Sequence, residues 1–322
     1  MTGTVLEEGL RGSGGYLLNG AGERFMHGYD PRGERATRDI VSRSIFSEMR
    51  AGRTAPNGGV FIEMKHLGVD AVRKSFKGMV ERCADCGFDL AGGRVEVVPT
   101  AHYMMGGVVF NGDCRTSLSG LFAAGEDTGG VHGANRLGGN GVANSTVYGG
   151  IAGDAMATWV RKEGHCHAPS EALIQQQIAL HDAPFTRKHG STQPLREALY
   201  DLMWQDAGIL RTRAGLLRAQ SQLLALDDEL DRVGVADDDR AFNLSWHDWL
   251  NLRSLIRVSH AIIAAALARE DSRGAHFRED FPETGDLDTS RYTVVQKRDD
   301  QLELTERPVI FTRVRPGETL IT

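Results

Sequence analysis

Two side chains, Arg136 and His102, have the chemistry to bind small carboxylates. Arg136 lies in the glycine-rich loop GGVHGANRLGGNG (129–141), and His102 lies in the segment PTAHY (99–103). A small dicarboxylate needs a cationic or hydrogen-bonding partner for each carboxylate, and arginine offers a planar fork that can bind one of them bidentately. Taken alone, the two residues are better explained as an arginine that caps a loop and a buried histidine that bonds to the backbone.

A second charged group, Glu8, Arg11 and Arg38, is a candidate either for proton transfer or for simple ion pairing. Glu8 and Arg11 are three residues apart, and Arg38 follows Thr37 where a helix is predicted to begin. Such a group is usually a salt-bridged helix N-terminus. Because the pKa of arginine lies above about 12, a role as proton donor requires neighbours that restore its proton at once.

The elements around the glycine-rich loop have the order expected in half of an α/β nucleotide-binding unit. Residues 120–126 (GLFAAGE) are a short apolar run bounded by glycines, which predicts a buried parallel strand. A helix is predicted over about 142–160. Glu126, at the end of the predicted strand, can accept hydrogen bonds from ribose or ribityl hydroxyls. The helix N-terminus near Gly141 favours negative charge, although glycines at such positions often form turns and nothing more.

The remaining elements follow from periodicity and turn residues. Strands are predicted at 16–18 and 23–26 around Asn19-Gly20, and within 94–110; helices are predicted at 37–50, with Thr37 as N-cap, and at about 69–85. Residues 193–232 and 246–270 carry Leu and Ile at helical spacing, which predicts a helical bundle. The tail alternates weakly around Arg298-Asp299-Asp300, which predicts a hairpin.

Three motifs between Val97 and Gly150 resemble the succinate dehydrogenase/fumarate reductase flavoprotein family, which also contains L-aspartate oxidase. In order they are PTAHYMMGG, GLFAAGE and VHGANRLGGNGVANSTVYGG. Similar family segments are EEGLRGSGGYLLN (7–19), GERFMHGYDPRGERATRDIVSRSI (22–45) and, more loosely, REDSRGAHFREDFP (269–282). The resemblance implies a mixed α+β and α/β fold. Its implied parts are a capping (substrate) domain portion at 1–95, the C-terminal part of an FAD-binding domain at 96–160, a helical C-terminal domain at 161–280 and a tail with a β-hairpin at 281–322.

The resemblance implies an FAD-dependent oxidoreductase that moves a hydride between flavin N5 and a small dicarboxylate such as succinate or fumarate. It assigns proton transfer to Arg38, with Glu8 and Arg11 restoring the proton. It assigns carboxylate binding to His102 and Arg136.

Cofactor contacts are implied for Glu126, on the FAD ribityl chain, and for the start of the helix, Asn140, Gly141 and Val142, against the flavin. The family usually has Asn-Ser-Leu at these three positions, so a serine that touches flavin is replaced by glycine. Glu7 replaces a family threonine that contacts substrate. A carboxylate there repels a dicarboxylate unless it is turned away or paired.

No strand–GxGxxG–helix phosphate loop, the element that cradles the FAD pyrophosphate, is recognisable in the sequence. We therefore expect the C-terminal portion of a family member, whether a truncated reading frame, one piece of a split protein or a fragment, that binds FAD weakly alone. The implied partners are a small dicarboxylate, a separate N-terminal FAD-binding half and an iron–sulfur subunit. The alternatives are L-aspartate oxidase, which the MMGG segment disfavours, and a fragment that is inactive without that half.

Composition and short motifs limit the partners, the location and the metal sites that we expect for this protein. The 322 residues carry a net charge of -6, which argues against nucleic acid as a partner. The N-terminus has no signal-peptide pattern and no apolar run of membrane-spanning length is apparent, so we expect a cytoplasmic protein, or one held peripherally at the membrane by partner subunits. The CxxC at 83–86 and the His-Cys-His at 165–167 are interpreted as chance spacings, because each lacks the further ligands that a zinc site needs.

Overall fold

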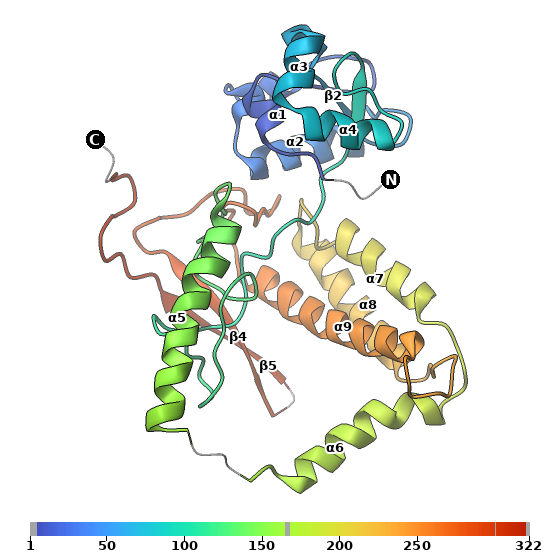
Figure 1. Ribbon diagram of the computed structural model, residues 1–322, viewed down its shortest axis with the longest axis vertical. Coiled ribbons are helices and arrows are strands. Elements are labelled where there is room, and N and C mark those ends of the chain that lie inside the picture. The colour runs from blue at the N-terminus through green and yellow to red at the C-terminus, as the bar shows by residue number, and fades with distance from the viewer. Residues whose placement is uncertain (1–4, 165–167, 300, 320–322) are drawn as a thin grey trace. The chain divides into compact units, whose positions relative to one another are not determined.

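The computed structural model describes residues 5–164, 168–299 and 301–319 (Figure 1). The His-Cys-His segment at 165–167 lies outside the described residues. The chain divides into two compact units, Met1–His102 and Tyr103–Thr322, which we describe separately as units 1 and 2. A mixed first unit and a helical second unit with a small terminal sheet confirm the predicted fold class. The four-part division of the chain stays a prediction.

Unit 1 is built on an antiparallel sheet with the strand order β1-β2-β3. The strands are β1 (Tyr16–Leu18), β2 (Val60–Glu63) and β3 (Arg94–Val97). The helices are α1 (Gly9–Gly12), α2 (Arg38–Arg50), α3 (Val69–Ser75) and α4 (Lys77–Asp85), and the 3-10 turns are η1 (Met26–Gly28), η2 (Gly33–Arg35) and η3 (Lys65–Leu67). Leu17 pairs with Ile62, which pairs with Val95, so one buried apolar row crosses the whole sheet.

The apolar face of helix α2 packs into the core of unit 1, and this packing fixes where the helix begins. Val41 and Ile45, four residues apart, are buried in the same cluster as Val60 of β2. Burying one such side chain stabilises the fold by roughly 1.5–3 kcal/mol. The helix predicted at 37–50 is confirmed, but Thr37 makes no side-chain cap hydrogen bond at the N-cap position. Packing, rather than a cap, therefore sets the position of Arg38 in the first turn.

Unit 2 contains the long helices and the terminal hairpin. Its elements are α5 (Asn140–Lys162), α6 (Glu171–Asp182), η4 (Ala183–Thr186), α7 (Gln193–Gln205), α8 (Arg213–Leu230), α9 (Leu244–Ala268), β4 (Arg291–Arg298) and β5 (Gln301–Pro308). Leu199, Leu223 and Ile256, one from each of α7, α8 and α9, are buried in one cluster. The predicted bundle and hairpin are confirmed, with Asp299 in the left-handed conformation (φ 48°) at the turn.

Helix α9 is long and apolar enough to cross a membrane by length and composition, which corrects the expectation that no segment of the chain would be. Some of its apolar residues are buried against the other helices of the bundle. Trp249 and Leu252 are fully buried in the bundle cluster, and the Trp249 indole donates to the carbonyl of Val233 at 3.1 Å. These contacts bury one face of α9 in the bundle, while Leu244, Leu255 and Val258 are exposed.

Residues 120–126 do not form the buried parallel strand that was predicted. Leu121 is 49% exposed, and Phe122 makes a single antiparallel bridge to Arg115. Among the described residues no strand lies beside this segment to complete a parallel ladder. An apolar run needs such a neighbour to satisfy its backbone groups, so here it adopts an irregular conformation.

Three smaller predictions also need correction. The expected return strand at 23–26 is reduced to one bridge, between Leu18 and Arg24, because η1 begins at Met26. The helix expected at about 69–85 is interrupted at Phe76, whose backbone leaves the helical region. The strand within 94–110 ends at Val97.

The loop after α9 contains a buried histidine whose protonation should destabilise unit 2. His276 Nε2 bonds the carbonyl of Arg269, while its Nδ1 lies 2.8 Å from Nη1 of Arg211 and must accept from it. Burial, together with the charge of Arg211, lowers the pKa of His276 to about 4. Because this pKa lies below the unfolded value of 6.5, the unfolded chain binds the proton first, and stability is lost as pH falls below about 6.5.

We expect about 2 kcal/mol of unfolding free energy to be lost through His276 between pH 7 and pH 5. Urea unfolding followed by tryptophan fluorescence measures this, because all four tryptophans lie in unit 2. His276→Gln should flatten the pH dependence by that amount, and the exposed His247→Gln should leave it unchanged. Equal slopes for wild type and His276→Gln would show that His276 is not the titrating group.

Candidate functional site

Unit 1 brings together all three residues of the predicted proton-transfer group. Glu8 lies between the two arginines: Arg38 Nε donates to Glu8 Oε2 at 2.5 Å, and Arg11 Nη2 donates to Glu8 Oε1 at 3.2 Å. Glu8 and Arg38 are 40% and 34% exposed, whereas Arg11 is 12% exposed. The arrangement is a short path of ion pairs from an accessible carboxylate to a guanidinium at the start of α2.

The buried end of this path is Arg11, whose positive charge is disfavoured by its surroundings. Burial lowers the pKa of the Arg11 guanidinium; Glu8 opposes the shift and the positive charge of Arg38 adds to it. Arg11 Nη1 also donates to the backbone carbonyl of Glu34 and, at 3.4 Å, to that of Ala36. Because both Nη1 and Nη2 are bonded, Arg11 is anchored, and it holds the Glu8 carboxylate in place beside Arg38.

Glu7 lies next to this group on the surface. Its side chain is exposed and, in the part of the chain that the structure describes, forms no hydrogen bond or ion pair. The carboxylate is therefore not neutralised by a cation of unit 1. Its predicted effect on a dicarboxylate remains untested.

In unit 2, Arg136 is 9% exposed and its guanidinium lies over an aromatic ring. Its guanidinium carbon is 4.3 Å from the centroid of Tyr103, and its backbone N–H donates to Met105 Sδ at 3.0 Å. The only oxygen that accepts from its guanidinium, among the described residues, is the carbonyl of Leu137, 3.3 Å from Nη1. Its Nε is buried without a partner. Most donors of this arginine are thus not used by the protein.

The glycine that replaces the family serine has a steric reason. A Cβ at Gly141 would lie 2.9 Å from the Tyr103 ring and 3.5 Å from Nη1 of Arg136. A contact of 2.9 Å forces the ring to move, so any larger residue displaces Tyr103 from beneath the guanidinium. The substitution is therefore coupled to the packing of Arg136.

The start of α5 leaves its backbone donors free of side-chain caps. The N-cap, Gly139, has a left-handed backbone (φ 80°) that favours glycine, it offers no side-chain acceptor, and the first turn holds no acidic residue. Asn140 and Val142 are exposed, Val142 by 77%. Glu126 is exposed as well and accepts from the backbone N–H of Met104 at 2.9 Å. An uncapped helix N-terminus beside an accessible carboxylate fits the flavin and ribityl parts of FAD.

His102, the last residue of unit 1, is exposed and forms no hydrogen bond in the described part of the chain. The buried histidine expected from the sequence alone is not found here. The structure thus gathers Glu8, Arg11 and Arg38 within unit 1. It gathers Arg136, Gly141 and their neighbours within unit 2.

Sequence reasoning missed three residues around Arg136, namely Tyr103, His132 and Asn144. They form a hydrogen-bonded cluster beneath it. The available signals were weak: Tyr103 directly follows His102, and His132 precedes Arg136 by four residues in the same motif. Nothing local marks Asn144, which is brought in by the first turns of α5.

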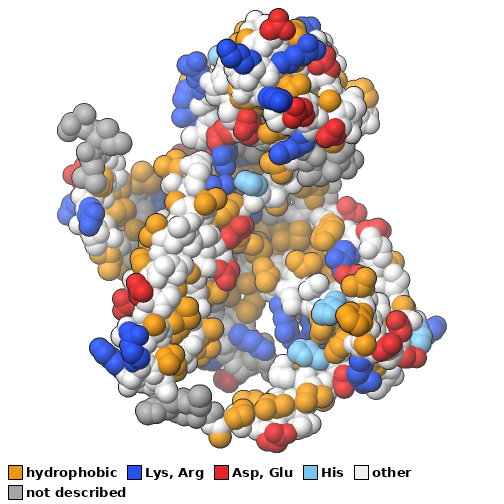
Figure 2. Space-filling model, viewed as in Figure 1, with side chains coloured by type: hydrophobic (Ala, Val, Ile, Leu, Met, Phe, Trp, Pro, Cys, Tyr) orange, Lys and Arg blue, Asp and Glu red, His pale blue; other side chains and the backbone are white. Residues whose placement is uncertain are grey.

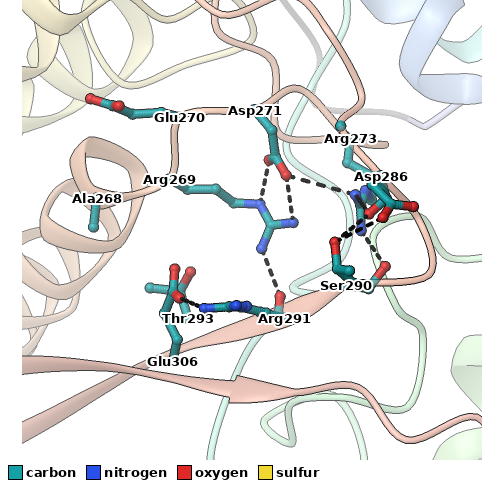
Figure 3. Close-up of a pocket in the computed structure, with 12 residues that line it drawn as sticks. Ala268, Arg269, Glu270, Asp271, Arg273, Asp286, Ser290, Arg291, Thr293 and Glu306 are labelled. Carbon is teal, nitrogen blue, oxygen red and sulfur yellow. Dashed lines mark hydrogen bonds and ion pairs between the residues drawn. The ribbon is translucent and has the colours of Figure 1, made fainter.

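A separate hollow of about 200 Å³ lies between the end of α9 and β4 (Figure 3). Arg269 is paired with Asp271 at 2.7 Å, and Arg273 Nη1 donates to Ser290 Oγ at 2.6 Å. Most of the charged side chains that line the hollow are bonded to one another or to the backbone, whereas Glu270 points away from them (Figure 3). Because these side chains already have hydrogen-bond or ion-pair partners, we interpret the hollow as a structural contact between the hairpin and the end of α9.

Comparison with known proteins places the chain among flavoproteins. Residues 1–142 match the family described as FAD binding domain, and residues 196–320 match the family described as fumarate reductase flavoprotein C-term. The chain is 41% identical over 284 residues to a subunit of the fumarate reductase (CoM/CoB) of Methanothermobacter marburgensis, covering 88% of this chain and 51% of the relative. It is 32% identical over 313 residues to L-aspartate oxidase of Nostoc sp., covering 91% and 52%.

Comparison with solved structures also finds a flavoprotein of this type. The solved E. coli quinol fumarate reductase FrdA, in a mutant form, matches with a TM-score of 0.87 and 30% identity over 98% of this chain and 58% of that chain. The chain therefore spans about half the length of the curated relatives that it matches.

Proposed function

Because the chain belongs to the succinate dehydrogenase/fumarate reductase flavoprotein family, whose cofactor is FAD, we propose that it contributes the dicarboxylate site of an FAD-dependent oxidoreductase. The reaction proposed is the interconversion of a saturated and an unsaturated small dicarboxylate, such as succinate and fumarate. The observation that carries the proposal is the Arg38–Glu8–Arg11 group, which offers both a proton donor and its reloading path.

The proton is handled by these three residues. In the direction of reduction, Arg38 gives a proton to the alkene carbon adjacent to the one that receives the hydride. Once Arg38 has lost its proton, Glu8, which lies within hydrogen-bonding distance of Arg38 Nε and is exposed, takes a proton from solvent and passes it to the guanidinium. Reloading is essential because, at pH 7, the charged form of arginine is favoured over the neutral form by about 10⁵-fold. Arg11 keeps Glu8 oriented between these transfers.

Substrate binding is assigned to cationic and hydrogen-bonding side chains. We propose that Arg136 binds one carboxylate, because among the described residues its Nε has no acceptor and only Leu137 takes a hydrogen bond from its guanidinium. His102 is proposed as a second carboxylate ligand, and its exposure leaves both ring nitrogens available. Glu7 is proposed to lie near the substrate, where its charge would influence which dicarboxylate is accepted.

FAD, when bound, supplies or accepts the hydride. We propose that Glu126 accepts hydrogen bonds from its ribityl hydroxyls. The backbone donors at Asn140, Gly141 and Val142 would face the pyrimidine edge, where the helix dipole favours negative charge.

A second candidate is L-aspartate oxidase, because proteins of that name match at 31–34% identity. The alternative substrate differs by an amino group in place of one hydrogen, so the two carboxylate sites serve both reactions. Fumarate reductase is favoured by the 41% identity to the methanogen fumarate reductase chain. Formation of iminoaspartate from aspartate, with no reduction of fumarate by a reduced dye, would reverse this preference.

The relatives are named as subunits of larger enzymes, and we propose partners for this chain as well. One is an FAD-binding half that completes the cofactor site, and another is an iron–sulfur subunit that carries electrons. The surface of α5 supports the first: Val142, Val147 and Val160 are 77%, 56% and 62% exposed, and Figure 2 shows apolar side chains over this helix. A cytoplasmic position, peripheral at the membrane through such partners, is proposed on the same basis.

The test is the visible spectrum and FAD affinity of the purified chain, alone and mixed with the complementary half of the Methanothermobacter marburgensis relative. We expect weak FAD binding by the chain alone, and flavin absorbance together with fumarate reduction in the mixture. The complementary half by itself is the control. If the mixture holds flavin but reduces no fumarate and oxidises neither succinate nor aspartate, the proposed reaction is wrong. If it holds no flavin, the chain is an inactive fragment.

A further inference from the structure

Beneath Arg136, three polar side chains of unit 2 form a closed cluster that the proposed mechanism does not use. The hydroxyl of Tyr103 lies 3.2 Å from His132 Nε2. Asn144, which is 4% exposed, places its Nδ2 at 3.3 Å from each of these two atoms and donates to the carbonyl of Gly125 at 3.0 Å. The cluster connects the segment after His102, the glycine-rich loop and α5.

Hydrogen-bond counting assigns the state of each member. Asn144 has two N–H donors, one for Gly125 and one shared between Tyr103 and His132. The Tyr103 hydroxyl then donates to His132 Nε2, which must carry no proton. Burial and the charge of Arg136 lower the pKa of His132, in agreement with a neutral ring. The charged and titratable groups that face His132 are thus Arg136 and Tyr103.

The cluster fixes the ring on which Arg136 rests. The hydroxyl contacts hold the Tyr103 ring in place at one end, and the ring lies edge-on to His132 with centroids 5.3 Å apart. The Arg136 guanidinium lies 4.3 Å from the ring centroid on a face that Gly141 leaves open. A cation over an aromatic face is held without using its N–H donors. The arginine is therefore oriented while most of its donors remain available to a ligand.

We propose that His132 is a positioning residue that, through Tyr103, orients the guanidinium of Arg136 for a substrate carboxylate. This inference rests on the proposed function for the identity of the ligand, a small dicarboxylate. The orientation itself is a property of the chain and can be measured without substrate. Bidentate recognition depends on the plane of the guanidinium, so loss of the platform should weaken substrate binding more than it slows the chemical step.

The first arm of the test measures orientation in the full chain alone, by ¹⁵N–¹H NMR of the Arg136 Nε–H group, assigned with Arg136→Lys. Because this proton lies near the face of Tyr103, we expect a single signal displaced upfield by the ring. His132→Leu and Gly141→Ala should abolish the displacement, whereas His132→Gln, which retains an acceptor, should keep it. An unchanged signal in His132→Leu would overturn the proposal, whatever the activity of the protein.

The second arm uses the chain mixed with the complementary half of the methanogen relative. His132→Leu and Tyr103→Phe should raise KM for fumarate about 10-fold, the scale of one lost hydrogen bond, with kcat within 2-fold of wild type. His132→Gln should restore KM, and the exposed His247→Leu is the matched control. A fall in kcat at unchanged KM would contradict a positioning role. If wild type itself reduces no fumarate, the proposed function fails and the NMR arm alone decides the inference.

Discussion

Replacing Arg38 with glutamine should lower kcat for fumarate reduction by about 10²–10⁴-fold, the range associated with a positioned general acid. Glutamine can still donate a hydrogen bond to Glu8, but it carries no proton that can be transferred to carbon. Because the ion pair with Glu8 lies at the start of α2 and is more than one-third exposed on its acidic side, its loss should affect stability little. The measurement is the steady-state rate of the chain mixed with the complementary half, at saturating fumarate.

Two further variants separate proton transfer from general effects of charge. Arg35→Gln removes an exposed arginine three residues earlier, and it should leave kcat unchanged. Glu8→Gln retains the shape of the proton path but cannot reload Arg38, so kcat should fall while flavin binding persists. A rate for Arg38→Gln within 10-fold of wild type would mean that another group donates the proton, and the assignment of Arg38 would be wrong.

Replacing the fully buried Arg278 with methionine should lower the unfolding free energy of unit 2 by about 2–3 kcal/mol, the cost of leaving the hydrogen-bond partners of a buried charged group unsatisfied; the cost is limited because Asp280 is 31% exposed. Its Nε and Nη2 donate to the two oxygens of Asp280 at 2.8 Å each. Its Nη1 donates at 2.8 Å to the carbonyl of Ala266, one of the last carbonyls of α9. Methionine fills much of the volume but leaves the carbonyl without a donor and the carboxylate without a cation.

Urea unfolding at pH 7, followed by tryptophan fluorescence, tests this prediction. Arg298→Met, which removes an exposed arginine paired with Glu303 near the hairpin turn, is the matched control and should change stability by less than about 1 kcal/mol. An equally small effect of Arg278→Met would show that the loop after α9 rearranges to satisfy the freed groups. In that case, the buried guanidinium would not be what holds the end of α9.

Local sequence was sufficient for the elements whose pattern is self-contained. The helix that begins at Arg38, the bundle helices α7 to α9 and the terminal hairpin all follow from apolar periodicity and turn residues, which act over a few residues. The segment at 120–126 shows the limit of this reasoning. Its composition suits a buried strand, but a strand also needs neighbours, and composition does not say whether they are present.

The candidate site divides in the same way. The types and order of residues determined which side chains could do the chemistry, because carboxylate binding and proton transfer need particular functional groups: Arg38, Arg136 and Glu8 were identified without coordinates. Only the tertiary structure decided that Arg38 meets Glu8 across 30 residues of chain. It alone showed that Tyr103, His132 and Asn144 form the support of Arg136, and that Gly141 must lack a side chain beside it. Such contacts depend on where the packing of distant elements brings a side chain, and that position is not encoded in any local pattern.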